Sequence, residues 1–232
     1  MILPVILEVR AVPPFMKNGF VVGCERTRDA IVIDPGDEVD QLLAVVQERG
    51  LHVQHILLTH AHIDHVTGVA AAKKAFGVPV YLHADDLFLY DRTVEQGAMF
   101  GFTVQQPPPV DVFYDTSPIA FGDYEVRVHH TPGHCPGGVC LELVRAGEAG
   151  KASGAGKAGG AETHLFVGDT LFAASIGRTD LPGGNYDVLM RSITEVIFPL
   201  GDEAIVHPGH GPDTTVRRER TTNPFVLEYL GS

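Results

Sequence analysis

Short apolar runs divided by turn residues predict the strands of this chain. Asp34-Pro35-Gly36, for example, supplies turn residues at the end of one such run. In residues 38–49 the apolar positions instead follow helical spacing, and Gly50 stands where a helix commonly ends. The predicted strands span residues 3–12, 19–24, 30–34, 53–58, 78–82, 124–129, 139–144, 164–167 and 204–206. The predicted helices span residues 38–49, 68–76, 186–198 and 214–220.

The order of these elements favours layered sheets with helices outside them. Short turns join the first strands, whereas later strands alternate with helices, which is typical of an α/β or α+β sandwich. A length of 232 residues suits one globular domain, so we expect a single domain over residues 1–232. Residues 146–161 are rich in Gly, Ala and Lys and stand between two predicted strands, which indicates a flexible loop insertion.

Composition and charge narrow the class of partner. The formal net charge of −12 disfavours nucleic acid and anionic membrane surfaces, which leaves a small molecule as the expected substrate. Three cysteines are too few for a disulfide framework, which favours a reducing compartment. The apolar runs fall short of the ~20 residues of a membrane span. The first run lacks the basic n-region of a signal peptide and carries Glu8 and Arg10, so it is interpreted as an edge strand. We therefore expect a cytoplasmic protein, whose oligomeric state the pattern does not indicate.

The strongest candidate for chemistry is the histidine-rich segment that follows the strand at residues 53–58. Three histidines and one aspartate, both common metal ligands, stand within residues 60–65. His60 and His62 are two positions apart at a strand end, so both side chains can point the same way. Asp64 and His65 follow a change of direction and can face a second point. The helical HExxH arrangement is absent, which disfavours that class of metalloprotease.

Two metal ions need more ligands than these four, and three further residues stand in matching contexts. His134, Asp169 and His210 each follow an apolar strand and a glycine that lets backbone approach closely. Taken singly, each fits an ordinary turn, but together they complete a set of five histidines and two aspartates.

The motifs THAHIDH, TPGH, GDTLF and PGHG, in that order, resemble the metallo-β-lactamase superfamily and specifically its glyoxalase II-like branch. The resemblance spans nearly the whole chain. It implies an αββα sandwich of two mixed β-sheets with helices on the outer faces, and two divalent metal ions, zinc foremost, with iron or manganese as alternatives. Asp64 and Asp169 are the expected catalytic residues. The implied ligands are His60, His62 and His134 for one metal and Asp64, His65 and His210 for the other, with Asp169 bridging both.

The implied activity is thioester hydrolysis of the glyoxalase II (hydroxyacylglutathione hydrolase) type, with a metal-bridged hydroxide as the nucleophile. A thiolate, with a pKa of ~8.5 in free cysteine, leaves without a strong general acid, so a thioester suits such a site. The expected substrate is an ester of glutathione or another thiol, such as S-D-lactoylglutathione.

Recognition of glutathione departs from the family pattern. Full-length glyoxalase II proteins carry a C-terminal helical domain that grips glutathione, whereas residues 211–232 alone follow the last ligand here, as in the short single-domain type. Arg178 matches a basic residue after the GDTLF motif and is predicted to bind a substrate carboxylate. An ion pair with Asp180 is the alternative. Asp180 and Pro212 stand where family members have aromatic residues.

Other activities on this fold stay open at this point. A mononuclear-iron persulfide dioxygenase would use His60, His134 and Asp169 to oxidise glutathione persulfide. Another hydrolase of this fold, acting on a lactone or an ester, and a metal-binding protein without turnover are further alternatives. We expect Asp34 to support the site and Cys135 to be a free thiol rather than a ligand. We interpret His207 as an ordinary packed or exposed histidine, with orientation of a ligand as the alternative.

Overall fold

The computed structural model describes residues 5–147 and 163–231, and it divides the chain into two compact units, Met1–Tyr124 and Glu125–Ser232. The expected single domain over residues 1–232 stays a prediction. Of the predicted loop insertion at residues 146–161, Ala146 and Gly147 form a turn and the rest lies outside the described residues. Within the described ranges, no helix is long and apolar enough to cross a bilayer.

The first unit is built on a mixed sheet with the order β1-β2-β3-β4-β5-β6. β1, β2 and β3 are antiparallel, whereas β3, β4, β5 and β6 run parallel. The strands are β1 (Val5–Arg10), β2 (Gly19–Cys24), β3 (Asp29–Ile33), β4 (His52–Leu57), β5 (Val80–Leu82) and β6 (Val112–Phe113), with β7 (Ile119–Phe121) just before the unit ends. The helices are α1 (Val39–Arg49), α2 (Ile63–Val66), α3 (Val69–Phe76), the 3-10 turn η1 (Ala84–Asp86), α4 (Leu87–Tyr90) and α5 (Thr93–Met99).

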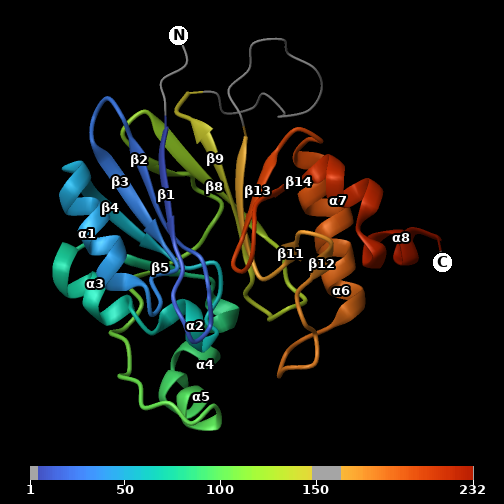
Figure 1. The fold of residues 1–232 in the computed structure, drawn as a ribbon, viewed down its shortest axis with the longest axis horizontal. Coiled ribbons are helices and arrows are strands. Elements are labelled where there is room, and N and C mark those ends of the chain that lie inside the picture. The colour runs from blue at the N-terminus through green and yellow to red at the C-terminus, as the bar shows by residue number, and fades with distance from the viewer. Residues whose placement is uncertain (1–4, 148–162, 232) are drawn as a thin grey trace. The chain divides into compact units, whose positions relative to one another are not determined.

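Helices α1 and α3 cover one face of this first sheet (Figure 1). The buried stripe of α1, formed by Leu42, Val45 and Val46, packs with alternate strand residues such as Val21 and Val32. This spacing, i and i+3/i+4 on the helix against i and i+2 on the strands, is the apolar pattern that predicted these elements.

The second unit is also a mixed sheet with helices. Its strands follow the order β14-β13-β10-β9-β8, and β10 runs parallel to β13 but antiparallel to β9. The strands are β8 (Tyr124–His130), β9 (Val139–Arg145), β10 (His164–Gly168), β13 (Ile205–Pro208) and β14 (Thr214–Thr215), with the small hairpin β11 (Leu171–Phe172) and β12 (Ser175–Ile176) beside them. The helices are α6 (Tyr186–Arg191), α7 (Val216–Thr222) and α8 (Pro224–Gly231).

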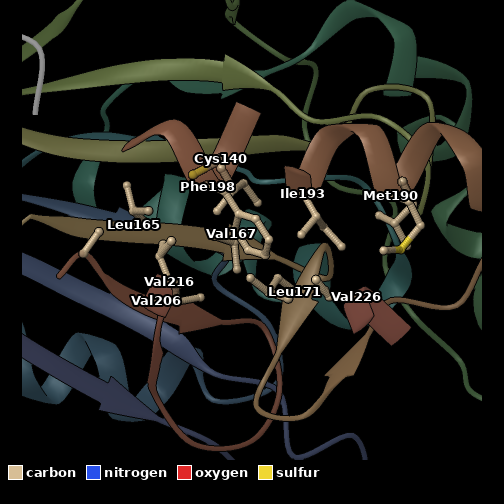
Figure 2. Close-up of a cluster of buried hydrophobic side chains, with 13 residues drawn as sticks. Cys140, Leu165, Val167, Leu171, Met190, Ile193, Phe198, Val206, Val216 and Val226 are labelled. Atoms are coloured by element: carbon tan, nitrogen blue, oxygen red, sulfur yellow. The ribbon is translucent and has the colours of Figure 1, made fainter. Parts of the chain in front are cut away.

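The core of the second unit joins its helices to the central strands. Figure 2 shows one cluster that includes Leu165 and Val167 of β10, Ile193 and Phe198 from the helical residues 192–200 after α6, and Val216 of α7. Burying such side chains stabilises the unit by about 1.5–3 kcal/mol each relative to exposure. The core therefore fixes the strand ends from which candidate site residues emerge.

Two predicted helices differ in detail from the structure. The predicted helix at 186–198 is α-helical as far as Arg191 and continues as a π-helix over Ser192–Ile197 and a 3-10 turn over Phe198–Leu200. At 214–220 the first two residues form β14 instead, and Thr215 then caps α7 by accepting a hydrogen bond from the Arg218 amide. The mixed α/β class itself is confirmed in both units.

Candidate metal centre

The first unit brings four predicted ligands together after β4. His62 is the extended residue that precedes α2, and Asp64 and His65 lie within that helix. The His60 ring lies 4.9 Å from that of His62 and 4.0 Å from that of His65, centroid to centroid. Asp64 Oδ2 lies 3.6 Å from His65 Nε2. We call His60, His62, Asp64 and His65 the first ligand group.

Asp34 holds two of these histidines in a defined orientation. It follows β3, the parallel neighbour of β4, so both strands deliver their next residues to the same sheet edge. Its Oδ2 accepts hydrogen bonds from Thr59 Oγ1 at 2.5 Å and from His65 Nδ1 at 2.9 Å. Since the Thr59 hydroxyl donates to Asp34, it accepts from His60 Nδ1 at 3.1 Å. These bonds place the lone pair of both imidazoles on Nε2, which makes Nε2 the atom that can bind a metal.

Two residues outside the motif fix the backbone around His62. The side chain of Gln96, on α5, accepts a hydrogen bond from the Ile63 amide and donates one to the Ala61 carbonyl, both at 3.1 Å. The carboxylate of buried Asp86 accepts from the Ala61 amide at 3.0 Å. The sequence analysis did not identify Gln96 or Asp86. Each follows another polar residue, Asp85 or Glu95, so the local sequence does not distinguish them or reveal a partner some thirty positions away.

The second unit brings together the other three predicted ligands. Asp169 follows β10 and His210 follows β13, and because these strands are parallel neighbours both residues emerge at one edge. Asp169 Oδ2 lies 3.5 Å from His210 Nε2 and 3.7 Å from Nε2 of His134, which lies between β8 and β9. We call His134, Asp169 and His210 the second ligand group.

Arg178 forms hydrogen bonds through both its backbone and its side chain. Its carbonyl accepts a hydrogen bond from His134 Nδ1 at 2.8 Å, so the lone pair of this histidine also lies on Nε2. Its exposed guanidinium donates two hydrogen bonds of 2.7 Å to Asp180, which is the ion pair expected as the alternative to substrate binding. These hydrogen bonds lower the pKa of Asp180 to about 2.

The remaining candidates have structural contacts. His207 is buried, bonds through Nε2 to His164 Nδ1 at 3.0 Å and through Nδ1 to Asp213 at 3.0 Å, and stacks on Phe166. It is therefore a packed histidine. Cys135 is buried and its sulfur is not part of a disulfide, and its expected role outside the ligand set stays a prediction.

Both ligand groups fit divalent metal ions. Imidazole nitrogens and carboxylate oxygens are ligands for zinc, iron and manganese. Two atoms that each lie about 2.0–2.2 Å from one tetrahedral ion are roughly 3.3–3.6 Å apart. The separations of 3.5 and 3.6 Å within the groups fall in this range and that of 3.7 Å lies just above it, which is compatible with shared coordination. The Nδ1 bonds of His60, His65 and His134 supply the orientation that metal-binding histidines normally have.

The class of protein follows from comparison with known families. The sequence model of the metallo-beta-lactamase superfamily matches residues 12–147, which include the whole first ligand group and His134. The chain belongs to the metallo-β-lactamase superfamily. This confirms the resemblance drawn from the THAHIDH and TPGH motifs and the fold class that it implied.

Individual relatives indicate the branch of the superfamily to which the chain is similar. The chain is 31% identical over 228 residues to the hydroxyacylglutathione hydrolase GloC of Haemophilus influenzae, covering 95% of this chain and 97% of the relative. It is 33% identical over 198 residues to the probable metallo-hydrolase YqgX of Bacillus subtilis, covering 84% of this chain and 86% of the relative. These relatives are consistent with the glyoxalase II-like branch.

Solved structures support the same placement. The B3 metallo-beta-lactamase BLEG-1 matches with a TM-score of 0.81 and 33% identity, over 95% of this chain and 99% of that one. TTHA1623, solved in a di-iron-bound form, matches with a TM-score of 0.78 and 37% identity, over 94% and 99%. ETHE1 from Myxococcus xanthus matches with a TM-score of 0.72 and 28% identity, over 96% and 85%.

Proposed function

We propose that this protein is a two-metal hydrolase that cleaves the thioester of a small acyl-thiol, of the hydroxyacylglutathione type. The observation that carries the proposal is the hydrogen bonding of His60, His65 and His134. Each bonds through Nδ1 to a fixed acceptor and so presents Nε2 as a metal ligand.

The two ligand groups together supply the donors for two ions. We propose that His60, His62 and His134 hold one metal, that Asp64, His65 and His210 hold the other, and that Asp169 bridges both. The short distances from Asp169 Oδ2 to His134 and His210, which belong to different metals in this scheme, support the bridging role. Zinc is the ion we expect, with iron as the first alternative because TTHA1623 is described in a di-iron-bound form.

The chemistry of the reaction divides between the ions and the chain. When bound, two divalent ions lower the pKa of a water molecule toward neutrality and polarise an acyl carbonyl. The Asp64 and Asp169 carboxylates can accept hydrogen bonds from the attacking water and so orient it toward the carbonyl carbon. Asp34, Thr59 and Gln96 hold the first ligand group rigid.

A thioester matches this arrangement better than a β-lactam amide. The thiolate leaves with a pKa near ~8.5 and needs no proton at neutral pH, whereas an amide nitrogen has to be protonated as it departs. Similarity to GloC supports a hydroxyacylglutathione, and similarity to BLEG-1 makes a β-lactam the competing substrate. We propose that Arg178 binds a carboxylate of the thiol portion, in exchange for Asp180.

A second candidate is oxidation of glutathione persulfide at a single iron. His134 and Asp169 already lie together in one unit, and with His60 they would form a site of two histidines and one carboxylate. This site would leave the Asp64, His65 and His210 set without a metal, so the metal content distinguishes the two candidates.

The test combines metal analysis with three assays on one preparation. We expect two metal ions per chain, thiol release from S-D-lactoylglutathione without oxygen uptake, and slower cleavage of a chromogenic β-lactam. One iron per chain with oxygen uptake on glutathione persulfide would establish the second candidate. Two metals with preferred β-lactam cleavage would retain the metal centre and reject the thioester.

A further inference from the structure

Lys17 and Glu38 form an ion pair in the interior of the first unit. Lys17 Nζ lies 2.6 Å from Glu38 Oε1, and each side chain is 1% exposed. Burial of two charges costs desolvation energy that their attraction often fails to recover, so such a pair is weak evidence for stability. A second role for the pair therefore has to be sought in its other contacts.

Those contacts fall on both ends of the turn Asp34-Pro35-Gly36. Lys17 Nζ also donates a hydrogen bond to the Asp34 carbonyl, and Glu38 Oε1 accepts one from the Gly36 amide at 2.8 Å. Asp34 has a φ of 48°, in the left-handed region that residues with a side chain rarely adopt. The ion pair thus holds the backbone of Asp34 in a conformation that is unfavourable without such contacts.

Close packing connects the turn at residues 34–36 with the segment that carries the ligand Asp64. A Cβ on Gly36 would meet the Asp64 carbonyl oxygen and would lie 2.8 Å from Lys17 Cε. The Gly68 amide, just after α2, donates to the Pro35 carbonyl at 3.0 Å. The turn is therefore held between the ion pair on one side and the segment that carries the ligand Asp64 on the other.

We propose that Lys17 and Glu38 are positioning residues for the metal centre. The pair fixes the left-handed backbone of Asp34, and the Asp34 carboxylate in turn orients His65 directly and His60 through Thr59. The pair also fixes the turn against which Asp64 packs. This inference rests on the proposed metal centre but not on its thioester specificity.

The decisive variant removes both charges and keeps the side-chain volumes. Lys17→Met with Glu38→Gln leaves no unpaired buried charge, and glutamine retains an oxygen for the Gly36 amide. The matched control is Lys73→Met with Asp111→Asn. This pair also has a 2.6 Å Nζ–Oδ2 contact and bonds to backbone, through the Val78 carbonyl and the Val80 amide, but does not touch residues 34–36.

Two measurements follow in the same proteins. Chelator competition gives the affinity for Co²⁺ or Zn²⁺, and the visible spectrum of the Co²⁺ form reports the ligand geometry. Nitrogen-15 NMR of the metal-free protein follows the His65 Nδ1 proton, which is protected from exchange while it bonds to Asp34. Thermal unfolding of the metal-free protein gives the stability of each variant.

We expect the Lys17→Met, Glu38→Gln variant to bind metal 10- to 100-fold more weakly. A loss of this size is typical when a residue that orients a metal ligand is replaced. Its Co²⁺ spectrum should change and its His65 Nδ1 proton should exchange faster, while the control variant keeps both. Wild-type affinity, spectrum and proton exchange would overturn the proposal, even if the melting temperature fell.

If the Lys17→Met, Glu38→Gln variant does not fold, Lys17→Gln with Glu38→Gln, which also leaves no unpaired buried charge, is measured by NMR, and an unchanged His65 proton would again overturn the proposal. The NMR result does not depend on bound metal. A wild-type protein that binds no metal would therefore defeat the proposed function, while the NMR result would still decide whether the ion pair orients His65. A protein that binds metal but cleaves no thioester would defeat the substrate assignment alone.

Discussion

The backbone carbonyl of Arg178 accepts a hydrogen bond from His134 Nδ1 at 2.8 Å while its guanidinium binds Asp180. One residue therefore orients a proposed metal ligand through its main chain and presents a cation through its side chain. Because a side-chain substitution leaves the carbonyl in place, the two roles can be separated by experiment.

Arg178→Ala should raise KM for S-D-lactoylglutathione more than it lowers kcat, and should leave the metal content unchanged. The exposed guanidinium is proposed to contribute uniform binding of a substrate carboxylate, whereas the carbonyl that holds His134 remains. Steady-state kinetics and metal analysis check both parts. Loss of metal in this variant would show that the side chain, too, supports the site.

Asp180→Asn should lower KM for the same substrate by a few-fold, since Asp180 would compete with the proposed substrate carboxylate for Arg178. The guanidinium holds the pKa of Asp180 at about 2, below its ordinary value of 3.8. The ion pair is therefore complete above about pH 4 and weakens only as the pH falls toward 2. The effect on KM should be constant from pH 6 to about 9, and a KM that rises in the variant would contradict the competition.

Asp169→Ala should lower the metal content of both sites and abolish hydrolysis, and His62→Ala should abolish hydrolysis as well. Asp169 is the proposed bridge, and its Oδ2 lies within 3.7 Å of two histidines. Asp213→Ala is the control, because this exposed carboxylate bonds to His207 instead. Two retained metals and near-normal turnover in Asp169→Ala would reject the site assignment.

Asp34→Asn should weaken metal binding by 10- to 100-fold although the side chain keeps its size. Asp34 Oδ2 accepts from Thr59 Oγ1 and His65 Nδ1, and Oδ1 accepts from the Thr59 amide. An asparagine NH₂ group at either position would face a donor. Chelator competition measures the loss, with Asp37→Asn as the control because its carboxylate meets only the exposed Thr67 hydroxyl among the bonds described.

Cys135→Ser should leave the metal content unchanged and the rate within a few-fold of wild type, because the proposed ligand set is complete without sulfur. The variant will lose some stability, since burying a hydroxyl costs about 1–3 kcal/mol. Cys140→Ser, in the buried core of the second unit, is the matched control for that cost. A metal lost from Cys135→Ser alone would place the thiol among the ligands.

Most strands were predictable because apolar runs and turn residues mark them locally. β2 spans Gly19–Cys24 as predicted, and α1 ends at the expected glycine, Gly50, which is left-handed. α8 escaped prediction although Asn223-Pro224 marks a helix start, with the Asn223 side chain accepting a bond from the Phe225 amide. The π-helical turn after Arg191 accompanies a bond from Ser192 Oγ to the Pro132 carbonyl, a tertiary contact sixty positions away.

The candidate site, too, has a part that could be predicted from the sequence and a part that could not. The ligand types could be identified because His and Asp follow strand ends in a specific motif. The contacts that orient them join residues distant in the chain, such as Gln96 with Ala61 and Lys17 with Glu38. Nothing in the local pattern around these residues specifies such pairs, because a buried polar side chain has many candidate partners until the fold is known.

Where two backbone segments of this molecule approach closely, a glycine can hardly be replaced by a larger residue. A Cβ on Gly177 would meet the Asp169 carbonyl, and a Cβ on Gly68 would meet that of Gly36, so any larger residue there has to displace the main chain. The neighbouring Arg178 and Asp180, by contrast, point into solvent. Evolution or laboratory selection can therefore alter the charge at positions 178 and 180, where the proposed substrate carboxylate would bind, while the backbone around the proposed ligands stays in place, which would give one scaffold a direct route to new specificities.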